Sequence, residues 1–447
     1  MKKTLAMMLS AAMVLSLAAC GGSGTSAATT AAPAAAETTA AAAAETQAAA
    51  AETPAPAAEG DKVLKVAVGC CLTGSGAKAG EGFKNATEMA LEDIDYKIGD
   101  YTIQPIYFDL TDDPEKGALA FEQAIVKDGA QMAMQGWFTT IAMSCMDVSA
   151  KYEIPYLFNY GAGQSLDDKW LEDPEYYSYY IGKTYPTSDF VANEYRDLVV
   201  DAFEKGELTG EKKLAIYGED SDWGRSIGDQ MDTGFKEVGF DVVYKEYFAG
   251  GTTDFYGILS KIKDSGATVV AGAPNTIASA AAFLKQAKEV GLDALIIAHG
   301  LNEYPEWKEL CGDAAEGAVT HLQVYADPEA GAEFEKRFKE KAGYDGGIGT
   351  EAVAYDCARC TFAALQACYD MYGVLDSETI YKFGCEEVQT GNWVYEDTIT
   401  IPAYRWTPGR LSCVAAPDAY FVPLAQVQDG EFKVIFPDDS AEATPNF

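Results

Sequence analysis

Histidine and basic side chains are scarce in this sequence of 447 residues. It holds two histidines, and its 33 lysines and arginines stand against 69 aspartates and glutamates, which gives a formal net charge of −36. A charge of this sign repels phosphate backbones, so we expect no nucleic acid partner. Because the sequence holds two histidines, few combinations of residues could form a catalytic Cys–His pair. A hydrolase of that kind is kept as an alternative, with Cys71 or Cys145 beside His299 or His321.

Sequence signatures of catalysis and of structural zinc are missing too. The chain has no G-x-S-x-G elbow and no H-E-x-x-H helix. Cys357 and Cys360 form one C-x-x-C without a second matching pair, which is a poor zinc site. We therefore expect no enzymatic activity, no cofactor and no metal. A disulfide among the late cysteines stays open, because its connectivity cannot be derived from the sequence.

Long apolar runs are absent after the first residues. The run Leu5–Leu17 follows Lys2 and Lys3, and it is short for a transmembrane helix. It ends in Leu17-Ala18-Ala19-Cys20, which resembles a bacterial lipobox. Residues 1–20 are therefore predicted to be a lipoprotein signal peptide that is cleaved before Cys20, which then carries the lipid. The protein would be extracytoplasmic and anchored to the cell membrane. An ordinary signal peptide cut after Ala19 is the alternative.

Large apolar side chains are nearly absent from residues 21–61, which are rich in Ala, Thr, Pro and Glu. Such a segment cannot bury enough surface to offset the entropy lost on ordering. We predict a disordered tether between the anchor and the folded part.

The stretch from Val66 to Asp95 is the first with a clear folding pattern. An apolar, β-branched run at Val63–Val68 predicts a buried parallel strand. A loop of small residues follows at Leu72–Ala77, and then apolar residues at helical spacing. A strand, a Gly-rich loop and a helix form the opening unit of a doubly wound α/β domain, in which that loop faces the ligand.

The rest of the folded part alternates strand and helix patterns, which predicts parallel sheets built from βαβ units. The expected strands are 101–108, 130–134, 154–158, 214–218, 242–248, 268–273 and 294–299. The expected helices are 115–127, 141–152, 189–203, 225–238, 255–265, 278–290, 329–342, 350–372 and 377–385. Residues 394–406 and 420–436 are predicted to be antiparallel strands, and residues 437–447 a loose tail.

Three spans together resemble the branched-chain amino-acid type of periplasmic binding proteins. The first holds Thr73, Gly74, Ala77 and Gly80. The second runs from Lys127-Asp128-Gly129 through Gly136 to Thr139-Thr140 and Ile154-Pro155. The third comprises Ala215-Ile216-Tyr217, Trp223-Gly224, Thr253-Asp254-Phe255 and 266–270. The resemblance covers about residues 62–436.

This resemblance implies two similar α/β lobes joined by a hinge of three segments. Lobe 1 would comprise 62–185 and 300–398, and lobe 2 would comprise 186–299 and 404–436. The chain would cross between the lobes near Tyr185, at His299-Gly300 and at Thr398–Tyr404. The implied function is capture of a small organic solute for the permease of an ABC importer, by a protein that is expected to be a monomer. A ligand-sensing receptor of the same fold is the alternative.

The resemblance also implies a ligand site. Thr139 and Thr140 fall where family members hold the ligand carboxylate, Trp223 falls at an aromatic position of the second lobe, and Glu303 could supply a carboxylate. The full set of expected ligand-binding residues is Trp137, Thr139, Thr140, Tyr160, Gly161, Ala162, Tyr185, Trp223, Asn275 and Glu303.

Each of these side chains also has a structural explanation. The tryptophans and tyrosines could pack between loop, sheet and hinge. Thr139, Thr140 and Asn275 could cap helices, and His299 could be a satisfied histidine at a strand end.

The solute is not fixed by these residues. Segment Lys183–Ser188 lacks the Asp that amino-acid binders carry near the hinge, and Cys71 replaces a usual Pro. Ala79 stands where an aromatic residue can occur, and Trp137-Phe138 is bulkier than the common pair. A branched-chain amino acid, an aromatic or aliphatic carboxylate, an amide and urea all remain open.

Overall fold

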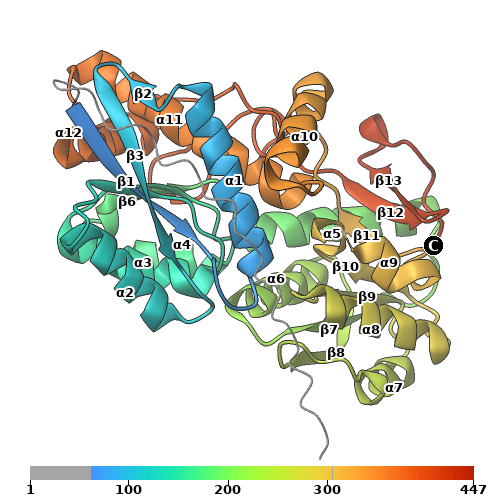
Figure 1. Ribbon diagram of the computed structural model, residues 1–447. Helices are drawn as coiled ribbons and strands as arrows, with labels where there is room; N and C mark the ends of the chain where they lie inside the picture. The colour runs from blue at the N-terminus through green and yellow to red at the C-terminus, as the bar shows by residue number, and fades with distance from the viewer. Residues whose placement is uncertain (1–61, 305) are drawn as a thin grey trace, which may run out of the picture. The chain divides into compact units, whose positions relative to one another are not determined.

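The computed structural model describes residues 62–304 and 306–447 (Figure 1). The predicted signal peptide at 1–20, the lipidated Cys20 and the tether at 21–61 lie outside the described residues. Within the described ranges, no helix combines the length and apolar character that a membrane crossing needs.

The first sheet is mainly parallel and has the strand order β2-β3-β1-β4-β5-β6. Its strands are β1 (Lys62–Cys70), β2 (Lys97–Ile98), β3 (Tyr101–Asp109), β4 (Met132–Met134), β5 (Tyr156–Asn159) and β6 (Tyr180–Lys183). The predicted opening strand is therefore central, with β3 and β4 parallel on either side. Short β2 is antiparallel and lies at the edge.

Helices cover both faces of this sheet. Helices α1 (Ala77–Asp93), α11 (Val353–Tyr372) and α12 (Ser377–Phe383) pack on one face, and α2 (Pro114–Val126), α3 (Thr139–Tyr152) and α4 (Gln164–Glu172) pack on the other. Alternate residues of β1 supply the two cores: Val66 and Val68 face α1, whereas Ala67 faces the α2–α3 side.

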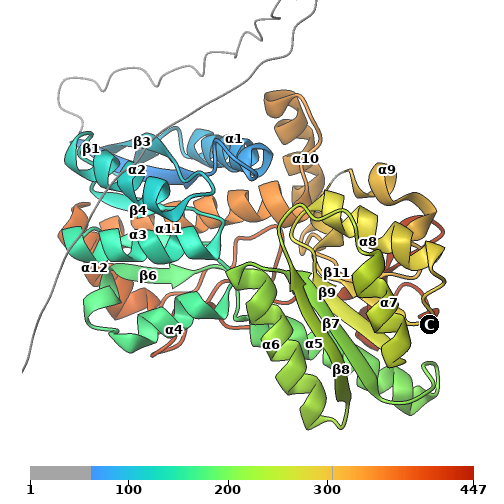
Figure 2. The ribbon, with the colours of Figure 1, turned by 90° about the horizontal axis from the view of Figure 1, so that it is seen from below.

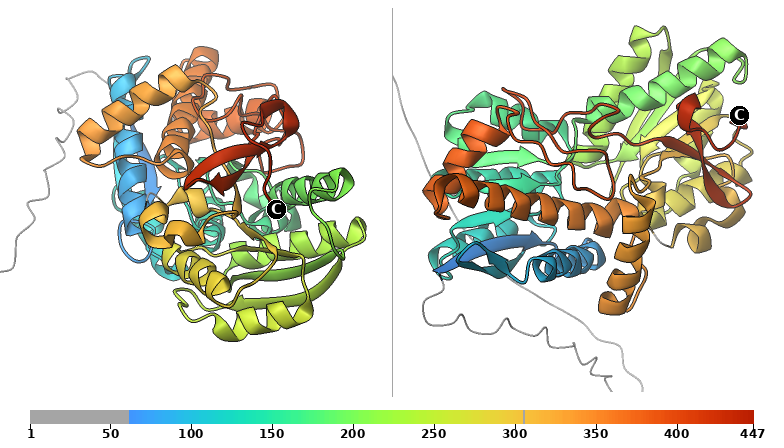
Figure 3. Two further views of the ribbon diagram at one scale, coloured as in Figure 1. Left: turned by 90° about the vertical axis from the view of Figure 1, so that its right-hand side faces the viewer. Right: turned by 90° about the horizontal axis from the view of Figure 1, so that it is seen from above.

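The second sheet has the order β13-β12-β11-β10-β9-β7-β8. Its strands are β7 (Lys213–Glu219), β8 (Asp241–Phe248), β9 (Val269–Ala273), β10 (Leu295–Ala298), β11 (Val319–His321), β12 (Leu424–Gln428) and β13 (Glu431–Phe436). Strands β7 to β11 are parallel, and the hairpin β12–β13 adds two antiparallel strands at one edge (Figure 3).

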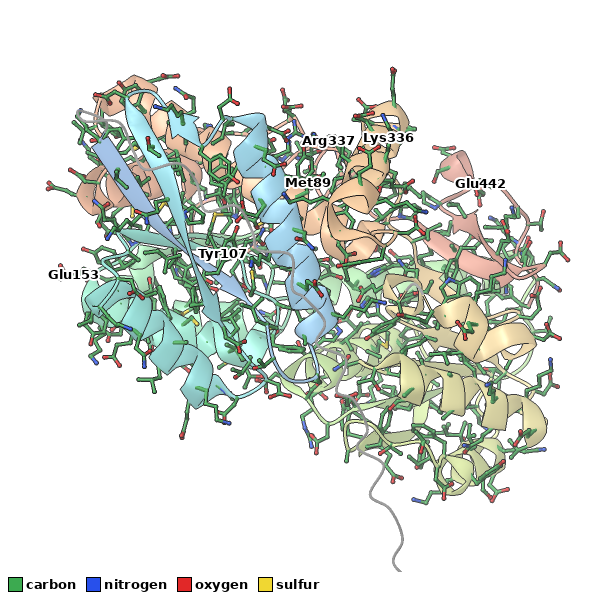
Figure 4. The ribbon with its side chains drawn as sticks, in the orientation of Figure 1. Met89, Tyr107, Glu153, Lys336, Arg337 and Glu442 are labelled. Carbon is green, nitrogen blue, oxygen red and sulfur yellow. The ribbon has the colours of Figure 1, made fainter. Side chains whose placement is uncertain are left out.

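This sheet is also covered on both faces (Figure 2). Helices α5 (Ser188–Lys205) and α6 (Asp222–Glu237) pack on one face, and α7 (Tyr256–Ser265), α8 (Ile277–Glu289) and α9 (Trp307–Cys311) on the other. Helix α10 (Pro328–Ala342) lies instead beside α1 of the first lobe, where Arg337 Nη2 donates to Asp93 Oδ1 at 2.6 Å (Figure 4).

Two expected lobe boundaries differ from the structure. The segment 300–398 was expected in lobe 1 after a crossing at His299-Gly300, but β11 pairs with β10 and β12, so the chain stays with the second sheet until His321. The segment 404–436 was expected in lobe 2, and its last part, the hairpin β12–β13, does belong to the second sheet. Trp406, however, stacks on Phe158 at 4.6 Å and Ser412 N donates to Asp167, so the stretch before the hairpin lies on lobe 1. Three-residue β11 was too short to show a strand pattern in the sequence.

Two predictions for the C-terminal part were wrong. Residues 394–406 form no regular strand, and their pairing is one isolated bridge between Tyr395 and Tyr404. Residues 437–447 are not loose, because Asn446 exchanges two 2.8 Å hydrogen bonds with the Gln426 side chain. The alternation of apolar residues in 394–406 comes from aromatic packing, since Trp406 and Tyr404 are fully buried.

Glycine allows the helix that follows the first long strand of each sheet to begin close to that strand. A Cβ at Gly80 in α1 would lie 1.9 Å from the backbone oxygen of Cys71. A Cβ at Gly224 in α6 would lie 2.1 Å from the backbone oxygen of Glu219. Only glycine permits these approaches, so β1 and β7 lead into their helices by the same kind of tight loop.

A buried ion pair joins three separate parts of lobe 1. Lys183 Nζ at the end of β6 lies 2.5 Å from Asp167 Oδ2 on α4, and the Lys183 side chain is 0% exposed. The Asp167 carboxylate also accepts from Ser412, and Lys183 Nζ donates to the carbonyl of Ala162 at 3.3 Å. The late segment around Ser412 is thereby held against β6.

We expect Asp167→Ala to destabilise the protein by about 3–5 kcal/mol, because it leaves the Lys183 ammonium buried without a counter-charge. Urea unfolding followed by circular dichroism would measure the loss. The matched control is Glu122→Ala, which breaks the exposed pair with Lys151 and should leave the unfolding midpoint nearly unchanged. Equal midpoints for the two variants would contradict this account of the Lys183 pair.

Candidate functional site

A cavity of about 100 Å³ lies between the two sheets, where the loops that follow the carboxyl ends of their parallel strands meet. It opens into an outer pocket of about 540 Å³. The cavity is lined by Trp137, Phe138, Thr139, Tyr160, Ala162, Tyr185, Trp223, Pro274, Asn275, His299, Gly300, Glu303 and Tyr304. These residues follow β4, β5 and β6 in lobe 1, and β7, β9 and β10 in lobe 2. Both lobes therefore build the same site, as expected at the carboxyl ends of parallel strands.

Aromatic rings form a continuous wall from one lobe to the other. Trp137 stacks on Tyr160 at 5.6 Å, and Tyr160 meets Tyr185 edge-on at 5.1 Å. Tyr185 then meets Trp223 of lobe 2 at 5.9 Å, and Trp223 lies 5.3 Å from the His299 ring. The tryptophans and tyrosines thus pack on one another and line the cavity at the same time.

The N-terminus of α3 borders the cavity at Thr139. The helix begins two residues earlier than expected, at Thr139, and its N-cap is Phe138, whose side chain forms no capping hydrogen bond. The explanation of Thr139 and Thr140 as caps is therefore wrong. The buried Thr139 hydroxyl accepts from Gly163 N at 2.9 Å, whereas Thr140 is exposed and lines the outer pocket. The first N–H groups of α3 have no acceptor within the helix, so they can bind an anion.

The lobe 2 wall is held by hydrogen bonds between its loops. Asn275 Nδ2 donates to Ser221 Oγ at 2.6 Å, and Tyr304 Oη donates to the backbone oxygen of Asn275 at 2.5 Å. Thr276 caps α8, so Asn275 is not the cap. The Asn275 side chain therefore lines the cavity from a fixed loop while its amide nitrogen donates to Ser221.

The base of the cavity in lobe 2 carries both histidines of the chain. His299 Nδ1 lies 3.0 Å from Tyr195 Oη, and the same hydroxyl accepts from His321 N at 2.8 Å. His321 Nε2 lies 3.3 Å from Glu303 Oε1. Burial, together with the neighbouring His321, holds the pKa of His299 well below its usual value, so this imidazole is neutral near pH 7.

Most of the expected ligand-binding residues come together at this cavity. Those that line it are Trp137, Thr139, Tyr160, Ala162, Tyr185, Trp223, Asn275 and Glu303. Thr140 reaches only the outer pocket. Gly161 is buried behind the wall, where its N–H donates to Asn159 Oδ1 at 2.5 Å.

The sequence did not single out Phe138, Pro274, Gly300 and Tyr304, which also line the cavity. Each is adjacent in the sequence to an expected residue or to His299. A prediction of whole loops, rather than of single residues, as ligand-binding would therefore have included them. His299 was considered as a structural residue at a strand end, as a hinge crossing and as the histidine of a Cys–His pair, but not as a ligand-binding residue.

No cysteine of the described residues lines the cavity. All cysteines of the described part are free thiols, so none of the late cysteines forms a disulfide there. Cys71 and Cys145 belong to the apolar core between the first sheet and α2–α3. Burial raises the pKa of Cys71 to about 12, which disfavours the nucleophilic thiolate. The ring nitrogens of His299 and His321 face Tyr195 and Glu303 instead.

Two sequence comparisons identify the same family. The family model described as periplasmic binding protein matches residues 63–383. Leu/Ile/Val-binding protein homolog 8 of Brucella abortus (strain 2308) is 23% identical over 366 residues, which cover 77% of this chain and 88% of that protein.

Solved structures show the same fold. A putative branched-chain amino acid ABC transporter protein from Silicibacter pomeroyi has a TM-score of 0.71 at 17% identity, over 86% of this chain and 98% of its own. A solute binding protein from R. palustris, solved with 4-hydroxybenzoate, has a TM-score of 0.66 at 21% identity, over 84% and 96%. The family and the two-lobed α/β fold predicted from the sequence are confirmed, and the chain belongs to the periplasmic binding protein family.

Proposed function

We propose that the protein captures a small organic solute, an amino acid or a related carboxylate or amide, in the cavity between its lobes. The observation that carries this proposal is that loops of both sheets close around one aromatic-lined cavity. A concave, mostly apolar site with a few fixed polar groups is the usual form of a small-molecule site.

The polar groups suggest how such a solute lies. A carboxylate fits against the N-terminus of α3, where free N–H groups can donate. An ammonium, amide or hydroxyl group at the other end fits Glu303 and Asn275, which line the lobe 2 side. Glu303 supplies the carboxylate that is missing near the hinge.

The solute body fits the aromatic wall. Trp137 and Trp223 come from opposite lobes and are only partly buried, so part of each ring is open to a ligand. Flat or apolar groups stack well on such rings. The R. palustris relative that was solved with 4-hydroxybenzoate supports an aromatic carboxylate, and the Leu/Ile/Val-binding homologues support a branched-chain amino acid.

The captured solute would then pass to the permease of an ABC importer, which the similarity to the ABC transporter protein from Silicibacter pomeroyi supports. We propose that the protein works without catalysis, as a monomer, outside the cytoplasm. Contacts between the lobes support a closing motion around the solute: Gln164 N donates to Ser226 Oγ at 3.0 Å, and Lys78 pairs with Glu306 across the outer pocket. A lipid on Cys20 would keep the protein beside its permease.

A thermal-shift screen of the protein against amino acids, aromatic acids, amides and urea tests the function. A solute present at a hundred times its dissociation constant should stabilise the folded state by about 2.7 kcal/mol, because it binds the folded protein alone. If no compound of these four classes raises the melting temperature, the proposed capture of small solutes is wrong.

Replacing Trp223 by Ala should weaken binding of any solute found in that screen by about tenfold or more, because the variant removes one face of the cavity. Isothermal titration calorimetry would measure the dissociation constant. Trp307→Ala is the control, since Trp307 packs on Phe432 of the same lobe outside the cavity. Unchanged affinity in the Trp223 variant would make this ring a packing residue.

Replacing Cys20 by Ala should move the protein from the membrane fraction to the soluble fraction of its native host, because the thioether-linked lipid can no longer form. Immunoblots of the two fractions would show the change. Cys385→Ala serves as the control, because this thiol lies in the folded part and only partly buried. Membrane retention of the Cys20 variant would favour another means of attachment.

A further inference from the structure

The two histidines of the whole sequence lie side by side at the base of the cavity, together with Glu303. The His299 and His321 ring centroids are 4.3 Å apart and the ring planes are nearly perpendicular, at 85°. One donor atom from each of His299, His321 and Glu303 lies within 4.8 Å of the other two. Two imidazoles and a carboxylate are a donor set that transition-metal cations prefer.

The backbone fixes the two histidines in place. His299 directly follows β10 and His321 ends β11, and the two strands pair in parallel through Ile297 and Val319. The backbone N–H of His299 donates to Gly272 at 2.9 Å, and that of His321 donates to Tyr195 Oη at 2.8 Å. A metal site needs this kind of rigid support, since ligands on mobile loops lose geometry.

The ring nitrogens are arranged for ligation. Tyr195 Oη holds His299 through Nδ1 at 3.0 Å, which leaves Nε2 of that ring for another partner. His321 is 1% exposed, and within the described ranges its buried Nε2 has no hydrogen-bond partner, although it points toward Glu303. A buried polar nitrogen without a hydrogen bond is costly, and a bound cation would satisfy it.

We propose that His299, His321 and Glu303 form a binding site for a divalent transition-metal cation of the zinc type. Three protein ligands leave a coordination position free, as in sites where zinc contacts another molecule. His299 and Glu303 line the cavity whereas His321 lies behind them, so the free position faces the cavity. That an amide or hydroxyl oxygen of the solute, rather than an ammonium group at Glu303, completes the coordination rests on the proposed function; the cation site itself does not.

The test is titration of the EDTA-treated, dialysed protein with zinc chloride alone, followed by isothermal titration calorimetry. We expect one zinc equivalent per chain. Glu303→Gln should weaken zinc binding by more than about 100-fold. Loss of a residue that binds the metal directly costs more affinity than loss of a residue that only hydrogen-bonds to such a ligand. Glu219→Gln is the matched control, since this half-buried carboxylate lines the outer pocket but is not one of the three ligands. Melting curves in EDTA show whether each variant is folded.

A second measurement does not depend on the Glu303 variant. Cobalt(II) in place of zinc should give the visible absorption of a four-coordinate site, and His299→Gln should remove it. Absence of stoichiometric zinc binding, or binding unchanged in Glu303→Gln, overturns the proposal and makes the cluster a plain Glu303–His321 ion pair. A thermal shift with a solute but no zinc binding overturns the metal site alone. Zinc binding without a solute shift supports the metal site and counts against solute capture.

Discussion

The polarity of parallel strands is the constraint on which the site depends. In a parallel sheet every strand ends at the same edge, so the loops that follow the strands gather there. In lobe 1 these are the loops after β4, β5 and β6, and in lobe 2 those after β7, β9 and β10. Residues as distant in sequence as Trp137 and Glu303 thereby reach one cavity, and neither lobe alone could enclose it.

Packing at the junction of the lobes follows from the same arrangement. The largest apolar cluster contains strand residues of both sheets, and Tyr160, Tyr185 and Tyr420 belong to it near the crossings. The Lys183–Asp167 pair fixes the end of β6 directly before Tyr185. The aromatic wall is consequently supported by a rigid strand end on the lobe 1 side and by the α6 N-terminus on the other.

Regular patterns in the sequence predicted most of the fold. The β-branched run at Val63–Val68 became the central strand of the first sheet, and the helix patterns of both lobes were found within a few residues. Prediction failed where the signal is short or non-periodic: β11 has three residues, and residues 394–406 are held by stacking of Trp406 on Phe158 and one bridge. Alternating aromatic residues look like a strand whether they pair with a neighbour or pack individually.

The sequence predicts which loops form the site, but not which side chains in those loops contact one another. Trp137, Tyr160 and Trp223 follow strand ends, which the sequence shows. That the Thr139 hydroxyl accepts from Gly163 N, or that the His299 ring meets the His321 ring, depends on distances between segments that are remote in the sequence. Local sequence patterns cannot predict such pairs, because the order of the strands in the sheet, not their order in the sequence, makes these residues neighbours.

The unpaired thiols have a consequence for how the molecule is made. Nine cysteines of the described part are free, and all but Cys385 are buried. In the folded protein, burial slows their oxidation by disfavouring the thiolate. If the chain is exported unfolded by its predicted leader, all nine thiols are exposed until it folds, and where oxidants are present every pair formed would be non-native. Folding and thiol oxidation would then be competing rates, and the redox conditions just after export would decide how much of the chain folds without a disulfide.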